Sequence, residues 1–432
     1  MKRSLLIFTV VWFSVLYSKA QTIIIDGEIR PRTEFQDGYS KPIGTANDPG
    51  VFTTQRTRLN FAYSNALIST MVSLQDARVF GQEAQTSSTA TVGIYQAWAE
   101  VLFFQGLTLK IGRQAVCFDD NRLFSSPQWS NTGTAHDMGL MKYSIDNWQF
   151  QLAAAFNNNS ANASETFYTQ GANYRSMNVL HITKPLSDGL SISAIAVDEG
   201  VQDTVGIGTA YTKMDMNHCY TFGGNLKFQN IKIPVSAKAT AYFQAGKSAT
   251  GKMMNGKLLA IKADFKFSNT ITANIGTDYL SGDANGTSDG ILSNFKKLYG
   301  ADHTFNGYMD YWNTPPTKGL LDYYASGAAK LGKNLCFELG YHLFNTDKPL
   351  KNSGVEVGKD LGSEMDFLVT YKINNWSTVQ SGYCRYFDTS NTLIAKSMAT
   401  NTVIRSPQWA YLMFTFKIKP PTPKGEQELE RK

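Results

Sequence analysis

The stretch EIRPRTEF, from Glu28 to Phe35, carries four charged side chains in its first seven residues. In an extended chain, alternate side chains share a face, so the charges gather on one face and the remaining residues on the other. The charged face is Glu28, Arg30, Arg32 and Glu34, and the other face is Ile29, Pro31, Thr33 and Phe35. A soluble β-sandwich turns its charges to bulk water, whereas a membrane barrel turns apolar residues to lipid and polar residues to a wet lumen. The stretch favours the wall of a barrel, because unpaired charges in a dry core are costly.

The same alternation recurs along the chain and predicts about eighteen strands of roughly nine to fourteen residues, a length that suits tilted membrane strands. Clear examples are 235–244, 258–268, 364–373 and 409–418, each with one apolar face and one that we expect to be wet. Two stretches, Met71–Phe80 and Trp376–Asp388, break the alternation. We expect β-bulges or a strand end there.

Connections between these strands alternate between short and long. Short turns rich in Asn, Asp or Gly are expected at 64–66, 105–106, 146–147, 185–189, 229–230, 268–269, 331–334 and 374–375. Long polar segments are expected at 36–50, 81–91, 115–136, 157–172, 199–217, 246–255, 282–318, 345–361 and 388–407. A sandwich or propeller has no reason to alternate in this way, but an outer-membrane barrel does. Residues 21–418 therefore predict an all-β, transmembrane antiparallel β-barrel of about 18 strands, with short periplasmic turns and long extracellular loops.

The two ends of the chain do not fit the barrel pattern. Residues 1–20 have a basic start, a short apolar run and a small-x-small site at Ser18-Lys19-Ala20, which predicts a secretory signal peptide cleaved before Gln21. An uncleaved anchor helix is the alternative, and the shortness of the apolar run argues against it. Residues 419–432, KPPTPKGEQELERK, predict a disordered periplasmic tail.

Composition narrows the possible functions. Without residues 1–20, which hold Lys2, Arg3 and Lys19, the net charge falls from +6 to +3, and no basic tract suits nucleic acid. The four cysteines are dispersed, so free thiols and one isolated bridge are both open. No histidine spacing indicates a metal site, and we expect no cofactor. Alternating Asp283, Asn285, Thr287 and Asp289 leave a calcium loop open, although the bidentate Glu of an EF-hand is missing.

Arginines are concentrated near the start of the mature chain, where seven of the twelve lie between positions 30 and 122. The candidate lumen or constriction cations are Arg30, Arg32, Arg56, Arg58, Arg78, Lys110, Arg113 and Arg122. The candidate supporting acids are Glu28, Glu34, Asp76, Glu100, Asp119, Asp120 and Asp137, of which the first four are expected to hold arginines upright by bidentate pairing. One interpretation is an electropositive constriction that attracts anionic solutes and releases them. The other is that the Arg–Glu ladders stiffen the wall.

The segment Leu109–Asp137, with GRQ followed by DDNRLF and by W…HD, resembles the alginate-export family of outer-membrane barrels. Supporting pieces are EIRPRTEF, TQRTRLNF, QDARVFG, QAWAE, DYLSGD and ADHTFNGYMDYW. The resemblance implies an arginine-lined lumen that passes a polyanionic uronate polysaccharide. It also implies that Asp119 and Asp120 order the loop that carries Arg122, whereas loop capping and salt bridging alone would explain these acids and Asp137.

We therefore expect an outer-membrane porin or export channel for anionic poly- or oligosaccharide, and not an enzyme. Its expected partners are outer-membrane lipid, the anionic solute, periplasmic chaperones and the barrel-assembly machinery. The alternatives are a general or phosphate/anion diffusion porin, an outer-membrane hydrolase or an adhesin. A hydrolase would need a nucleophile beside a histidine and an acid, and no GxSxG motif is present. Solute identity, direction of transport, gating and oligomeric state are left open.

Overall fold

A computed structural model describes residues 21–87, 89, 91–158, 160–161, 174–202, 216–229, 233–284 and 290–419. The expected signal peptide, residues 1–20, lies outside the described residues. So does the expected tail apart from Lys419, and so does the 285–289 part of the candidate calcium loop.

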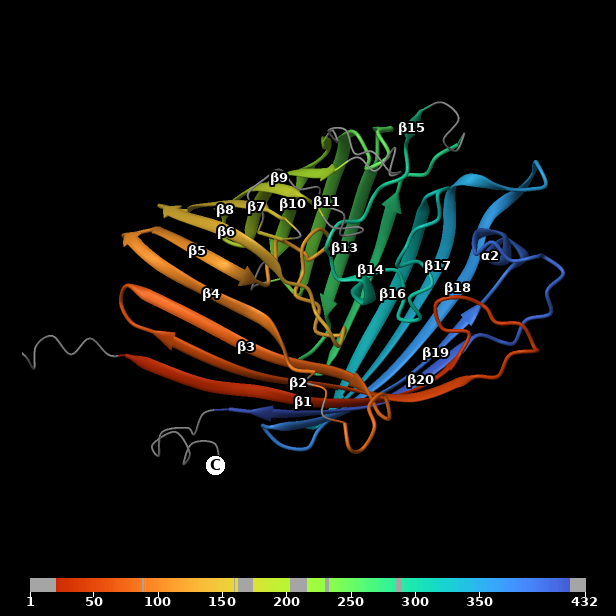
Figure 1. The fold of residues 1–432 in the computed structure, drawn as a ribbon. Coiled ribbons are helices and arrows are strands. Elements are labelled where there is room, and N and C mark those ends of the chain that lie inside the picture. Colours follow the sequence, from red (N-terminus) through yellow and green to blue (C-terminus); the bar gives the residue numbers. More distant parts are fainter. Residues whose placement is uncertain are drawn as a thin grey trace, which may run out of the picture.

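Eighteen antiparallel strands form one closed sheet, in which β1 pairs with both β2 and β20 (Figure 1). The first nine are β1 (Thr22–Asp37), β2 (Gly50–Ser64), β3 (Ile68–Val79), β4 (Gly93–Phe104), β5 (Leu107–Gln114), β6 (His136–Ile145), β7 (Trp148–Phe156), β8 (Ser176–Ser187) and β9 (Leu190–Gln202). The others are β10 (Met216–Gln229), β11 (Val235–Gly246), β13 (Lys257–Lys266), β14 (Ile271–Leu280), β16 (Leu320–Leu331), β17 (Leu335–Asn352), β18 (Val355–Lys372), β19 (Ser377–Phe387) and β20 (Gln408–Ile418). Outside the barrel wall lie the strand pair β12 (Met253–Met254) and β15 (Ile291–Leu292), the 3₁₀ helix η1 (Asp302–Thr304) and helix α2 (Ser390–Ala395). The predicted barrel is confirmed.

The strand bounds are alternately close and far apart along the chain, which defines a short-turn end and a loop end. Parts of the connections expected at 81–91, 157–172, 199–217 and 229–230 lie outside the described residues. β1 begins and β20 ends at the short-turn end (Figure 1). One predicted loop is wrong: most of 345–361 is strand, because β17 and β18 extend as a hairpin whose tip is Ser353-Gly354. This hairpin carries polar residues on both faces, which hid the period of two that identifies strands facing lipid.

The two stretches that break the alternation differ in the structure. The β3–β4 ladder has a bulge, since Ser73 pairs with Gln96 and Leu74 with Ile94, which leaves Tyr95 as the extra residue on β4. β19 pairs with both neighbours without a register shift and ends at Phe387, so of the two alternatives expected there, a bulge or a strand end, the strand end is confirmed. The irregular pattern arises because β19 turns Cys384 and Tyr386 inward and Arg385 outward, near the loop end.

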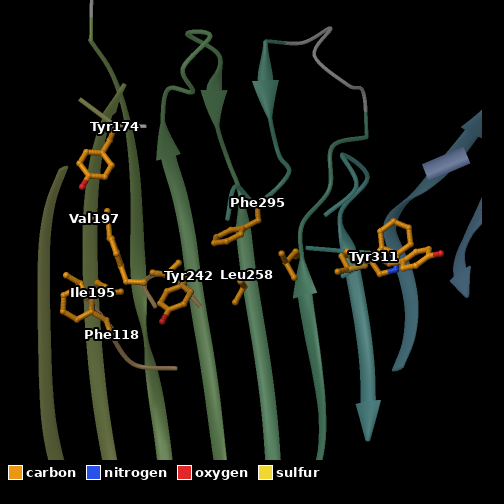
Figure 2. Close-up of a cluster of buried hydrophobic side chains, with 14 of the residues drawn as sticks. Phe118, Tyr174, Ile195, Val197, Tyr242, Leu258, Phe295 and Tyr311 are labelled. Atoms are coloured by element: carbon orange, nitrogen blue, oxygen red, sulfur yellow. The ribbon is translucent and has the colours of Figure 1, made fainter. Parts of the chain in front are cut away.

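The outer face of the barrel is apolar, with exposed residues such as Phe61, Ile111 and Leu152. The inner face is not wet throughout, which corrects the prediction. Toward the loop end the inward residues form a buried apolar band, to which neighbouring strands contribute. Figure 2 shows Phe118 and Phe295, from two long connections, in the same band as Ile195, Tyr242 and Leu258 of the wall. The band therefore serves as a packing surface for loops that fold into the barrel.

Other sequence expectations concern thiols and metal sites. All four cysteines are free, which decides against an isolated disulfide bridge. In the described ranges, no group of three or more His, Cys, Asp or Glu side chains could hold a metal ion. None of the helices within those ranges has the length and apolar character of a membrane span.

Candidate functional site

The connection from 115 to 135, here called the inward loop, leaves β5 at the loop end and crosses the inside of the barrel before it reaches β6. Near its start, Asp119 Oδ1 lies 3.0 Å from His181 Nε2 on β8. Farther along, Thr240 of β11 donates to Asp120. The loop then contacts the connection between β14 and β16, where the Ser125 amide donates to the Tyr299 carbonyl over 3.0 Å. The inward loop thus touches the wall at widely separated strands and narrows the lumen.

One arginine of β1 and one of β2 hold residues 128–130 of the inward loop. Arg30 and Arg56 lie opposite each other in the register, and both side chains point inward. Arg30 donates to the carbonyls of Gln128, Trp129 and Ser130, with Nη2 2.9 Å from the Trp129 oxygen and 3.2 Å from the Ser130 oxygen. Arg56 Nη1 donates to the Gln128 and Ser130 carbonyls at 3.1 and 2.8 Å. Their forked guanidinium groups therefore replace the strand partners that these loop carbonyls lack.

The next two arginines of the cluster also face inward but make fewer loop contacts. Arg32 lies over the Trp129 ring, with its Cζ 3.9 Å from the ring centroid, and donates to the Trp129 carbonyl. Arg58 lies over the Tyr95 ring at 3.9 Å and donates to Gln75. The stacking orients both cations while leaving their charge in place.

Two of the supporting acids pair with these arginines. Glu28 Oε1 lies 2.5 Å from Arg56 Nη2, and Glu34 Oε1 lies 2.8 Å from Arg32 Nε. In each ion pair the arginine contacts a single carboxylate oxygen, so these pairs are not the expected bidentate pairs.

Arg122 makes the most buried ion pair of the inward loop. Its Nη1 and Nη2 donate to the two carboxylate oxygens of Asp278 on β14 at 2.7 and 2.8 Å, while its Nε donates to Asp120 at 3.0 Å. The residues are only 9% and 1% exposed for Arg122 and Asp278. Burial by itself would lower the pKa of Arg122, but Asp278 and Asp120 raise it above its ordinary value. Arg122 therefore stays charged and fastens the loop to the wall.

The connection between β14 and β16 also enters the barrel, and we call its 293–319 part the second inward loop. The Met309 amide donates to Glu364 of β18 over 2.7 Å. His303 stacks on Trp129 of the first loop with ring centroids 4.1 Å apart, and Phe305 lies under the Arg122 guanidinium. The two loops therefore support each other across the lumen.

Four of the candidate site residues lie on the outer face. Residues that pair across neighbouring strands point to the same face of the sheet. On β2, Arg56 and Arg58 point inward, so Gln55 and Thr57, which alternate with them, point outward. Arg78 pairs with Gln55 and Asp76 pairs with Thr57, so both point outward as well. Arg113 and Asp137 pair with each other on the face that carries Ile111. Each arginine forms an ion pair with its acid, at 2.7 Å for Arg78–Asp76 and 3.0 Å for Arg113–Asp137. Their placement as lumen residues is wrong, because the sequence shows the residue type but not the face at a strand end.

Two further candidates, Lys110 on β5 and Glu100 on β4, face inward but make different contacts from those expected. Lys110 Nζ lies 3.8 Å from the Trp98 ring centroid. Glu100 accepts from Thr108 and pairs with Lys142 at 3.1 Å. The prediction that Glu100 holds an arginine upright is wrong, since the strands that carry the inward arginines lie two or more positions away in the sheet.

Three cavities border the inward loop. The first, of about 440 Å³, is the arginine-side cavity, with Arg56, Arg58, Lys417 and Lys419 against Asp26 and Glu28. The other two, of about 410 Å³ each, share Asp120 of the inward loop and Lys238 of the opposite wall. One of them extends toward Lys227 and the other toward Lys262. We call these two the lysine-side cavities.

Sequence reasoning missed three parts of this site: Asp278, the second inward loop as a lumen element, and the lysines of β10, β11 and β13. Asp278 opens the DYLSGD segment and the second loop contains ADHTFNGYMDYW, but a chemical role for either depends on contacts with distant residues. Lys238 and Lys262 fall on the expected wet faces of 235–244 and 258–268, so a count of inward cations over these strands would have found them. Lys227 enters the row through its register with Lys238.

Comparisons with known proteins agree with this geometry. A family model described as alginate export matches residues 22–402. The comparison with curated proteins gives no match. Among solved structures, the fold is similar to Pseudomonas aeruginosa OpdO (TM-score 0.62, 12% identity, 92% of this chain and 97% of that chain). It is also similar to P. aeruginosa OccD3 (OpdP) (0.60, 12%, 92% and 92%) and to P. aeruginosa OpdK with vanillate (0.61, 9%, 92% and 99%).

Proposed function

Because this chain belongs to the alginate export family, we propose that it forms an outer-membrane channel for anionic saccharides, with uronate polymers or oligomers as the cargo. Family and fold are those of a transport channel and not of an enzyme. In such a barrel the short-turn end faces the periplasm and the loop end faces outward. The cargo and the role of the arginines are the parts that need testing.

The observation that supports an anionic cargo is the charge of the arginine-side cavity. Its lining has four cations, Arg56, Arg58, Lys417 and Lys419, against two acids. Arg56 is paired with Glu28, but Arg58 donates to the neutral side chain of Gln75 and keeps its charge. A cleft with low-dielectric walls concentrates the field of such a charge. Anions would therefore be enriched in the periplasmic half of the channel.

In planar bilayers with a potassium chloride gradient, we expect the zero-current potential to show anion preference. Replacing Arg58 and Lys417 together by glutamine should lower the anion-to-cation permeability ratio by about twofold or more, because both line the arginine-side cavity and neither donates to an inward-loop carbonyl. Uronate hexamers should interrupt the current, while neutral glucose oligomers of the same length should not. Interruption by inorganic phosphate alone would instead favour the diffusion-porin alternative.

The matched control is the pair Arg78→Gln and Arg113→Gln, which removes two cations from the outer face. This pair should leave the zero-current potential unchanged. Cation preference in the unmodified protein, or an equal shift in both double variants, would contradict the proposal.

The proposal includes a route to the membrane, in which residues 1–20 are removed as a signal peptide and periplasmic chaperones and the assembly machinery insert the barrel. Intact-mass measurement of the protein extracted from outer membranes should give a chain that begins at Gln21. A mass that retains residues 1–20 would support the anchor-helix alternative. Replacement of Ala20 by a bulky residue is the control, since it should retain the leader.

A further inference from the structure

Three lysines stand side by side on the inner wall opposite the arginines. In the register, Lys227 of β10 lies directly opposite Lys238 of β11, and Lys238 lies directly opposite Lys262 of β13. Neighbouring strands are about 4.8 Å apart, so the three ammonium groups form a short row across the wall. Like charges that face each other across strands destabilise a sheet. A row of this kind needs an explanation other than stability.

Nearby acids neutralise the row only in part, with Asp120 and Asp146 lining one lysine-side cavity and Asp120 and Glu338 lining the other. Lys262 pairs with Asp264 at 3.0 Å, whereas neither Lys227 nor Lys238 forms an ion pair within the part of the chain that the structure describes. Asp120, which shares both lysine-side cavities with Lys238, already accepts from Arg122 and Thr240. Lys227 and Lys238 therefore line a cavity without an ion pair of their own among the described residues.

The space around the row suits a saccharide. The two lysine-side cavities, of about 410 Å³ each, flank Lys238, and the β13-side cavity is also lined by Tyr308, Tyr324 and Asn274. Aromatic faces pack against the apolar faces of sugar rings, and amides bond to hydroxyls. A chain whose carboxylates recur at each sugar could extend from one cavity to the other along the lysines.

We propose that Lys227 and Lys238 are the cations that directly bind the carboxylates of an acidic saccharide, whereas Arg30 and Arg56 mainly position the inward loop. This assignment rests on the proposed function, because it concerns the same cargo. Lysine suits this role because its flexible ammonium donates in several directions and lets an anion move on, while a bidentate arginine holds it more firmly.

The test is the double variant Lys227→Gln and Lys238→Gln in single-channel recordings with a uronate hexamer. We expect the blocked-state lifetime to fall by about tenfold or more, since two charge-assisted hydrogen bonds are removed. The temperature at which the barrel unfolds on detergent gels should stay the same or rise, because repulsion within the row is relieved. A purely structural role would give the opposite result, a lower unfolding temperature.

The control is Lys330→Gln with Lys372→Gln, which removes the same charge from inward positions of β16 and β18 outside all three cavities. It should leave the blocked-state lifetime within about twofold of the unmodified value. Equal lifetimes in the unmodified protein and the Lys227/Lys238 variant would overturn this inference while the proposed function stands. No block of the unmodified channel by the hexamer would overturn the proposed uronate cargo itself.

Discussion

Arg122→Ala is expected to destabilise the barrel by roughly 3–5 kcal/mol, because it leaves the buried carboxylate of Asp278 without its cation. The register places Asp278 directly opposite Asp322, which is also fully buried and is paired with His342. Removing Arg122 would therefore leave two neighbouring carboxylates in a water-poor site. Urea titration of the refolded protein in lipid bilayers would measure the loss.

A matched control is Arg113→Ala, which removes an arginine from an exposed ion pair on the outer face and should cost about 1 kcal/mol or less. Removing both partners, with Arg122→Met and Asp278→Leu, should recover part of the stability, since the buried Asp278 charge is then gone while Asp120 still lacks Arg122. Equal stability of Arg122→Ala and Arg113→Ala would show that the Arg122–Asp278 pair does not fasten the inward loop.

Much of the barrel wall could be predicted from the sequence because lipid imposes a local rule on every second residue. Strands such as β11 and β20 show this rule in full, and their hairpin turns carry their own Asn, Asp or Gly signals. The rule fails where lipid is absent. The β17–β18 hairpin extends past the wall, so its residues do not alternate between apolar and polar. Near the loop end, β19 turns the charged Arg385 outward.

The site could be predicted only in part, because its geometry depends on contacts between distant residues. The inward direction of Arg30 and Arg56 follows from alternation. Their carbonyl partners lie on a distant loop, which for Arg30 is about a hundred positions away along the chain. Polarity alone indicated that 115–136 is a long connection, and nothing local shows that it turns into the barrel. The apolar residues Phe118 and Phe124 within this polar segment were the available signal, since an exposed loop has no need of them.

Arg30→Ala with Arg56→Ala is expected to raise the single-channel conductance severalfold, because it removes the guanidinium donors to the Gln128 and Ser130 carbonyls and leaves the Trp129 carbonyl with Arg32 alone. The freed segment would find water as its partner and swing away from β1 and β2, which widens the arginine-side route. Recordings should also show more current noise, since the 128–130 segment loses two of its anchors and samples several positions.

The lysine pair, Arg30→Lys with Arg56→Lys, separates the two roles that these arginines can have. Lysine keeps the positive charge but cannot bridge two carbonyls with a planar fork. If the arginines act mainly as anchors, the lysine variant should conduct more than the unmodified protein while it keeps the same anion preference. If they act mainly as selectivity charges, the lysine variant should match the unmodified protein in both properties, and the alanine variant should lose anion preference without a gain in conductance. The carbonyl contacts of both guanidinium groups favour the first result.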